Sequence, residues 1–282
     1  MNYTLITGAC GGLGKAFVKI LAENKENLVL VGTSEKKLQA LVEEYRDLFF
    51  DLSIKTIVCN LAKLKDRETL IESLKKDEIV VNKLINNAGV IIEGDLLKFK
   101  DEEISNAVEV NCIGTLDLTK KIIEVRDESQ KLEILTVASQ AAFQPIPHMA
   151  VYAATKSFLV SMMTALSVEL KDKNIVFTTS CPSGMATTQE MKDSIESMGF
   201  KGKITTLSTE KVAKISLKAL KKKKAVVIPG VVNKLVGIFS KFCSYHGLAK
   251  TTGKMWKKSQ KKRNFWYDFI SFLKIGLTKN VI

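Results

Sequence analysis

The sequence is poor in the residues that build metal centres and disulfide frameworks. It contains two histidines, His148 and His246, and carboxylates are not grouped around either of them, so a protein metal site has almost no ligands. Its five cysteines are odd in number, widely scattered and never in CxxC spacing, which excludes the paired zinc and redox motifs. We therefore predict no metal site and a cytoplasmic, reducing environment.

The chain also lacks the segments that direct a protein into a membrane. No basic leader precedes the glycine-rich sequence that begins at Gly8, so we expect neither a signal peptide nor an N-terminal anchor. No run of about eighteen apolar residues is free of a charge or a helix breaker, which disfavours a spanning helix.

Acidic residues are scarce in one part of the chain only. From Lys211 onward there are 18 Lys and Arg against a single acid, Asp268, whereas residues 1–210 hold 25 bases and 29 acids. The net charge of +13 therefore belongs to the C-terminal part, and the preceding body is mildly acidic.

What is present is an alternation of short apolar runs with helical patterns. Apolar residues recur at helical spacing over Leu13–Leu21 and Glu35–Tyr45. Continuously apolar strands between helices predict an α/β fold, a Rossmann-like doubly wound parallel sheet with helices on both faces, followed by a C-terminal helical extension. Ligands of such folds bind beyond the carboxyl ends of the strands. The predicted strands are Asn2–Thr7, Leu28–Val31, Ile54–Val58, Lys83–Ile85, Leu132–Val137, Ile175–Thr179 and Ala225–Ile228.

A glycine-rich turn separates the first predicted strand from the first helix. The segment Thr7-Gly8-Ala9-Cys10-Gly11-Gly12-Leu13-Gly14 lets the chain turn sharply and brings backbone N–H groups to a pyrophosphate at the positive end of the helix. Such a turn could be merely structural when it stands alone. Its place at the start of an alternating pattern predicts a dinucleotide site.

A second motif, Tyr152-Ala153-Ala154-Thr155-Lys156, carries acid–base chemistry. A spacing of four places both polar side chains on one face of a helix. An ammonium group beside a phenol favours the ionised phenol, so we expect Lys156 to lower the pKa of Tyr152 from its usual value of about 10. Taken alone, the motif could also be a helix surface with a packed tyrosine and a solvated lysine.

These motifs, taken together, resemble the short-chain dehydrogenase/reductase family. The resemblance covers roughly Asn2 to Pro229 and includes the TGxxxGxG turn, Asn86-Asn87-Ala88-Gly89 after the fourth strand, and Ser139 thirteen residues before Tyr152. It implies hydride transfer between a nicotinamide cofactor and a ketone or secondary alcohol, with Tyr152 as proton donor or acceptor. The implied catalytic residues are Asn111, Ser139, Tyr152 and Lys156.

The resemblance also implies a set of cofactor contacts. Gly32-Thr33-Ser34 has no acid at the end of the second strand, where family members usually hold the ribose, so NADP(H) is favoured and NAD(H) remains an alternative. Lys15, Lys36 and Lys37 could help or could be solvated. Asn60 stands in place of the usual aspartate. The implied cofactor-binding residues are Gly8, Cys10, Gly12, Leu13, Gly14, Thr33, Ser34, Asn60, Leu61, Asn87, Ala88, Gly89, Tyr152, Lys156, Pro182 and Thr187.

We divide the chain into two parts, a catalytic domain over residues 1–230 and a basic extension over residues 231–282. The domain includes a substrate lid at about 183–205, where Ser183 replaces the glycine usual in the family. Met185, Met191, Met198 and Phe200 suggest an apolar ligand such as a steroid or an acyl chain, although methionines also fill core gaps.

Three interpretations fit the extension, residues 231–282: membrane contact, packing on protein, and binding to nucleic acid. Aromatic and basic residues there fit peripheral contact with an anionic membrane, and an apolar helix face would instead pack on the body or on a second subunit of a homo-oligomer. Basic charge alone supplies only unspecific binding to nucleic acid. The competing function is a catalytically weak cofactor-binding protein that uses this extension as a membrane or partner adapter.

Overall fold

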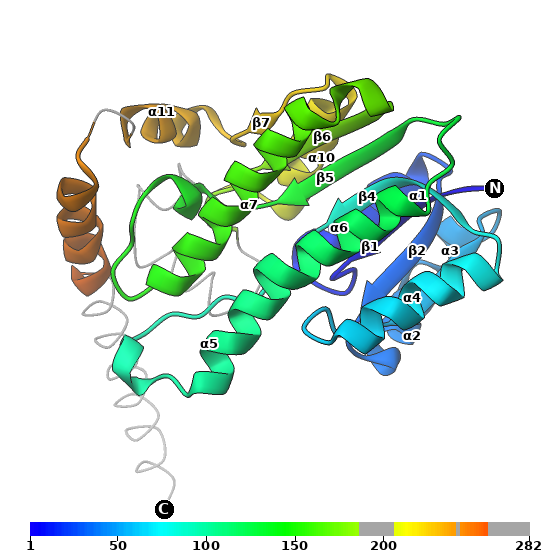
Figure 1. The fold of residues 1–282 in the computed structure, drawn as a ribbon, viewed down its shortest axis with the longest axis horizontal. Coiled ribbons are helices and arrows are strands. Elements are labelled where there is room, and N and C mark those ends of the chain that lie inside the picture. Colours follow the sequence, from blue (N-terminus) through cyan, green and yellow to red (C-terminus); the bar gives the residue numbers. More distant parts are fainter. Residues whose placement is uncertain (186–205, 241–242, 259–282) are drawn as a thin grey trace, which may run out of the picture.

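The computed structural model of the chain describes residues 1–185, 206–240 and 243–258. Seven strands form one sheet in the order β3-β2-β1-β4-β5-β6-β7, and every neighbouring pair is parallel. Helices cover both faces of this sheet (Figure 1). The predicted doubly wound α/β fold is confirmed, and the strand order reverses at β1 and β4, where such folds bind their ligands.

The predicted strands match the observed ones closely. The largest difference is in β4, which begins three residues early because Val80 and Val81 pair with the start of β1. The strands are β1 (Asn2–Thr7), β2 (Asn27–Gly32), β3 (Ile54–Val58), β4 (Val80–Asn86), β5 (Leu132–Val137), β6 (Ile175–Ser180) and β7 (Val226–Val227).

The helices include one π-helix, η2, and three short 3₁₀ turns, η1, η3 and η4. A further helix covers residues 245–258. The remaining bounds are α1 (Gly12–Glu23), α2 (Glu35–Glu44), α3 (Arg46–Phe49), α4 (Leu64–Lys76), η1 (Leu96–Lys98), α5 (Asp101–Val108), η2 (Glu109–Gly114), α6 (Thr115–Glu124), η3 (Gln140–Phe143), α7 (Ala150–Glu169), η4 (Lys171–Lys173), α10 (Thr209–Lys221) and α11 (Val231–Ser240).

The two largest hydrophobic cores lie on opposite faces of the sheet. One joins the strands to α4, α6 and α7 through residues such as Leu70, Leu118 and Met163. The other joins them to α1, α2 and α10 through residues such as Phe17 and Leu41. The strands are apolar on both faces because both faces are covered, and this burial fixes the carboxyl ends of the strands that carry the site.

Helix α7 is long and apolar enough to cross a membrane by length and composition, and it is the only such helix among the described residues. It carries Tyr152 and Lys156, and both side chains are buried in the body of the protein. It also packs against β6 and η3. We therefore assign α7 to the folded domain.

Candidate active site

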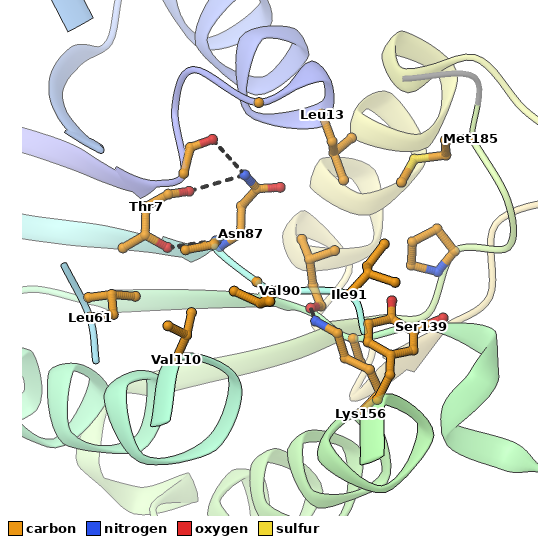
Figure 2. A pocket seen from close by; sticks show the side chains of 18 of the residues that line it. Thr7, Leu13, Leu61, Asn87, Val90, Ile91, Val110, Ser139, Lys156 and Met185 are labelled. Carbon is orange, nitrogen blue, oxygen red and sulfur yellow. Dashed lines mark hydrogen bonds between the residues drawn. The ribbon is translucent and has the colours of Figure 1, made fainter. Parts of the chain in front are cut away.

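A cavity of about 920 Å³ opens at the carboxyl ends of the strands, a size at the upper end of the usual range for ligand pockets. Figure 2 shows it between the glycine turn, the segment after β4 and the start of α7. Of the predicted site residues, those that line it are Gly8, Cys10, Leu13, Thr33, Ser34, Asn60, Leu61, Asn87, Ala88, Gly89, Ser139, Tyr152, Lys156 and Pro182.

Of the remaining predicted residues, three do not line the cavity and one is not described. Gly12 and Gly14 lie in the first turn of α1 and do not line the cavity. Asn111 does not line it either, but its side chain binds Val90, which does. Thr187 lies outside the described residues, as does most of the predicted lid.

The glycine turn leaves the start of α1 open to an anion. The helix begins at Gly12 with no side-chain cap and no acid in its first turn, so its positive end faces the cavity without a competing charge. Gly14 is required for packing, because a Cβ there would lie 2.2 Å from the carbonyl oxygen of Gly8. Gly14 thus allows the close packing of the turn against α1, although it does not line the cavity.

The segment after β4 is fastened to the glycine turn. The side chain of Asn87 donates to the carbonyl oxygens of Thr7 and Gly8, at 3.1 and 3.0 Å. The Thr7 hydroxyl accepts from the backbone N–H groups of Asn87 and Ala88, both at 3.0 Å. These bonds are drawn in Figure 2, and they fix the two walls of the cavity relative to each other.

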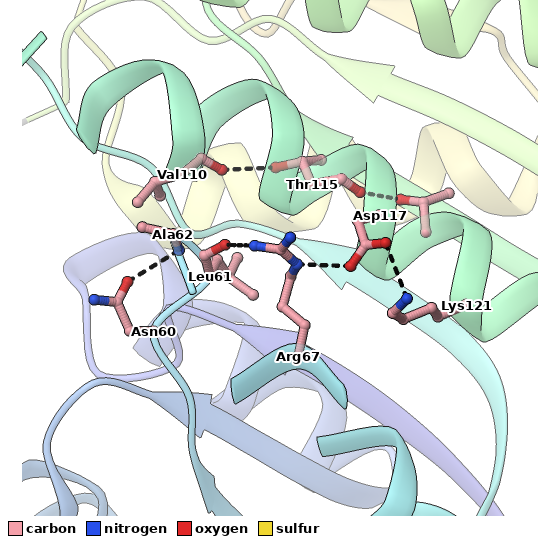
Figure 3. A network of polar contacts seen from close by, with 9 residues as sticks. Asn60, Leu61, Ala62, Arg67, Val110, Thr115, Asp117 and Lys121 are labelled. Atoms are coloured by element: carbon pink, nitrogen blue, oxygen red, sulfur yellow. Dashed lines mark hydrogen bonds and ion pairs between the residues drawn. The ribbon is translucent and has the colours of Figure 1, made fainter. Parts of the chain in front are cut away.

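The segment after β3 is held by a polar network (Figure 3). The Asn60 side-chain oxygen accepts from Ala62 N–H at 3.0 Å, an acceptor role that an aspartate could also fill. Arg67 is buried; it donates to the carbonyl oxygen of Leu61 and pairs with Asp117 at 2.6 Å. Lys121 also binds Asp117, at 3.1 Å. Burial pushes the pKa of Asp117 upward, but the hydrogen bonds from Arg67 and Lys121 outweigh it and lower the pKa.

The segment after β2 brings two hydroxyls and one cation to the cavity. The Ser34 hydroxyl accepts from Lys37 N–H at 3.4 Å and caps α2. Thr33, Ser34 and Lys37 all line the cavity, whereas Lys15 is paired with Glu44 on the surface and Lys36 does not reach the cavity lining. Of the three lysines considered from the sequence, Lys37 is the one at this site.

Tyr152, Lys156 and Ser139 meet at the floor of the cavity. The ammonium nitrogen of Lys156 lies 5.8 Å from the centre of the Tyr152 ring and donates to the carbonyl oxygen of Val137 at 3.1 Å. Tyr152 and Lys156 are both buried. The one-face arrangement expected from the YxxxK spacing is therefore present.

The expected direction of the Tyr152 pKa is wrong for this structure. Burial raises the pKa of the phenol, and a hydrogen bond from Ser139 offsets this only in part. Burial also lowers the pKa of Lys156 to about 8, against smaller contributions from Cys112 and Cys181 that raise it. Burial therefore sets the direction of both pKa shifts, and the phenol keeps its proton at neutral pH.

Asn111 lies within the π-helix η2 and is fully buried. Its side-chain oxygen accepts from Val90 N–H at 2.8 Å, and its amide nitrogen donates to the carbonyl oxygen of Val90 at 2.9 Å and to the Thr155 hydroxyl at 3.0 Å. A π-turn inside a longer helix is frequent at functional sites. Here the π-turn brings Asn111 against α7, where it binds Thr155, the residue that precedes Lys156.

The part of the cavity above Lys156 and Ser139 is mostly apolar, and most of its residues were not predicted from the sequence. In Figure 2, Ile91, Leu13 and Met185 gather above Lys156 and Ser139. The loop before α7 adds Ile146 and Met149. The sequence marked Leu13 as a cofactor contact and Met185 as a ligand contact, but not Ile91, Ile146 or Met149, because a short irregular loop carries no periodic signal.

A model of the short chain dehydrogenase family matches residues 2–198. Among curated proteins, the very-long-chain 3-oxoacyl-CoA reductase of Neurospora crassa is 37% identical over 178 residues, which are 62% of this chain and 53% of that protein. The chain spans about half the length of the curated relatives that it matches first.

Solved structures show the same fold. A 3-ketoacyl-(acyl-carrier-protein) reductase from Brucella melitensis complexed with NADH has a TM-score of 0.67 and 26% identity, over 82% of this chain and 96% of that one. A short-chain dehydrogenase from Sphingobium yanoikuyae in complex with NADPH has a TM-score of 0.71 and 23% identity, over 86% and 95%.

Proposed function

Because the chain belongs to the short-chain dehydrogenase family, a family of NAD(P)-dependent oxidoreductases, we propose that it reduces the ketone of a long 3-oxoacyl-CoA thioester with NADPH. The observation that carries this proposal is the buried Tyr152–Lys156 pair at the floor of a large cavity. Several relatives over 30% identical are named very-long-chain 3-oxoacyl-CoA reductases, which supports an acyl ketone over other ketones.

The residues of the cavity suit a dinucleotide. The uncapped start of α1 suits a pyrophosphate, and the segment at Asn60 and Leu61 suits the adenine end. Asn87, Ala88 and Gly89 would hold the middle of the cofactor. When bound, the nicotinamide supplies the hydride that is added to the carbonyl carbon.

Tyr152 acts as the general acid in this proposal. Its phenol donates a proton to the ketone oxygen while the carbonyl carbon gains hydride, so the product is a secondary alcohol. The raised pKa of Tyr152 suits this direction, because the phenol enters the reaction protonated. Ser139 orients the substrate oxygen, and the ammonium of Lys156 stabilises the phenolate that is left behind.

Asn111 keeps Lys156 in place in this proposal. It joins Val90 to α7 through hydrogen bonds on both sides of its amide. Lys156 binds the carbonyl oxygen of Val137, which leaves its remaining protons for the phenolate and for the ribose of the cofactor.

Lys37 supports NADPH over NADH. It lines the cavity beside Thr33 and Ser34, where a 2′-phosphate would gain one cation and two hydroxyl donors. None of the three carries a negative charge that would repel the phosphate.

The test measures cofactor oxidation by the full chain with 3-oxoacyl-CoA thioesters of increasing length, once with NADPH and once with NADH. We expect turnover that increases with chain length and a lower KM for NADPH. Turnover confined to small ketones, or none with any thioester, would remove the acyl assignment.

We also propose that α11 contacts an anionic membrane surface. This helix turns its small and polar residues Asn233, Gly237 and Ser240 inward and leaves Val231 and Leu235 exposed, by 78% and 50%. An apolar face beside the exposed Lys234 suits a helix that lies in a lipid interface.

Vesicle flotation tests this membrane contact. The parent is expected to float with anionic vesicles, and Leu235→Glu is expected to reduce the bound fraction. Leu64→Glu, a similarly exposed leucine on α4, is the matched control. Equal flotation of both variants would contradict the membrane contact. A parent that forms oligomers but does not float with vesicles would contradict it as well.

A further inference from the structure

The helix over residues 245–258 packs on the body along a single stripe. Leu248, Ala249, Thr252, Gly253 and Trp256 are partly buried, whereas Lys250, Lys254, Lys257 and Lys258 are exposed. Positions three and four residues apart share a face of a helix. The basic residues of this helix thus face solvent, and its less polar face lies against the catalytic domain.

The surface that this stripe covers is the loop just before α7. The Thr252 hydroxyl donates to the carbonyl oxygen of Pro145 at 2.9 Å. Gly253 lies so close to Pro147 that an added Cβ would be 3.1 Å from the proline ring. The extension therefore reaches a loop more than one hundred residues earlier in the chain.

Trp256 joins this loop to a second one. Its indole stacks on the imidazole of His148, with ring centroids 3.8 Å apart and planes 14° apart. Its Nε1–H donates to Glu93 Oε1 at 2.6 Å. Glu93 belongs to the segment after β4, so one side chain holds two segments that are far apart in the sequence.

These two segments are the walls of the substrate side of the cavity. Ile91 comes from the first wall, and Ile146 and Met149 come from the second. The walls also touch directly, since Gly94 N–H donates to the carbonyl oxygen of His148 at 2.8 Å. His148 has a φ of 67°, a left-handed conformation that costs a non-glycine residue energy unless its surroundings hold it.

We propose that Trp256 is a positioning residue that sets the spacing of the two substrate walls and thereby selects long acyl ketones. This inference deepens the proposed function and rests on it. The indole is a rigid aromatic group with one donor, so it fixes both the separation and the register of the walls. In this proposal the C-terminal extension contributes to substrate selection, because Trp256 positions the two walls of the cavity.

The first test compares Trp256→Ala in the full chain with Met255→Ala, an exposed neighbour on the same helix. We expect Trp256→Ala to raise KM for a long 3-oxoacyl-CoA by about tenfold, with kcat and the KM for NADPH within about twofold. Trp256→Phe keeps an aromatic ring but lacks the N–H donor, so its KM for the thioester is expected to lie between those of the parent and Trp256→Ala. An unchanged KM in Trp256→Ala would overturn the proposal.

The second test does not depend on turnover. Amide hydrogen exchange of residues 144–149 and 91–94 is measured in the parent, Trp256→Ala and Met255→Ala. We expect faster exchange of both walls in Trp256→Ala alone, with unchanged exchange in β1 and β4. Absence of turnover in the parent would count against the proposed function, whereas equal exchange in all three proteins would count against the role of Trp256.

Discussion

The ammonium nitrogen of Lys156 lies 5.8 Å from the centre of the Tyr152 ring, and both side chains are buried. The proximity is enforced by α7, whose turn places residues four apart on one face. Both groups titrate away from their ordinary values because both are buried, the phenol upward and the ammonium to about 8.

The lowered pKa of Lys156 predicts a pH effect on stability. Unfolding returns this lysine to its ordinary pKa of 10.5, so between about pH 8 and pH 10.5 the unfolded chain binds more protons than the folded one. Stability therefore gains from this residue as pH rises through that window. Relative to Lys156→Met, the free energy of unfolding of the parent should rise by up to about 3 kcal/mol.

Denaturant titrations of both proteins at several pH values measure this difference. Other lysines and tyrosines titrate in both chains and cancel in the comparison. A difference that stays constant with pH, or that shrinks as pH rises, would show that Lys156 is not desolvated as described.

A side chain at Gly89 is expected to impair catalysis rather than folding. A Cβ there would lie 3.2 Å from Lys156 Nζ and 3.3 Å from Asn111 Oδ1, so Gly89→Ala must displace one or both groups by a few tenths of an ångström. We expect kcat to fall by at least about tenfold with thermal stability nearly unchanged. Gly184→Ala is the control and should keep its activity, because Gly184 also lines the cavity but an added Cβ would lie 4.0 Å from the Thr206 hydroxyl, an ordinary contact distance.

Arg67 is expected to support both the fold and the cofactor. Arg67→Met leaves Asp117 with Lys121 as its remaining partner and takes the Arg67 donor from the carbonyl oxygen of Leu61, so it should cost about 2 kcal/mol of stability. It should also weaken cofactor binding, measured by fluorescence titration. Lys120→Met, which breaks the exposed pair with Glu124, should cost less than about 1 kcal/mol. Similar losses in both variants would contradict the account.

Lys37 tests the choice of cofactor. Lys37→Ala removes the cation that lines the cavity next to Ser34 and should weaken NADPH binding by about tenfold while NADH binding stays within about twofold. Lys36→Ala, on the exposed start of the same helix, should leave both affinities unchanged. Equal losses for the two cofactors would assign Lys37 a role other than phosphate recognition.

The features that the sequence predicted well are those set by local geometry. Strands buried on both faces read as continuous apolar runs, and the helical spacing of Tyr152 and Lys156 placed them together before any tertiary contact was known. The division at residue 230 and the lid over 183–205 stay predictions. The glycine turn was placed correctly, yet Gly12 and Gly14 shape it without lining the cavity.

The features that the sequence missed depend on contacts between distant segments. Arg67 is a charged helix residue of the kind that is usually solvated, and its partner Asp117 lies 50 positions away. The pKa of Tyr152 was given the wrong direction because burial of its phenol is a tertiary property. No motif or periodicity marked Trp256, because its stacking on His148 is a contact between segments far apart in the sequence.

The most direct test of the central claim compares the parent with Tyr152→Phe, which keeps the ring and deletes the acidic proton. At saturating NADPH and a long 3-oxoacyl-CoA, the account predicts that kcat falls by about 10²–10⁴-fold while the affinity for NADPH changes by less than about twofold. A variant that turns over as fast as the parent would contradict it.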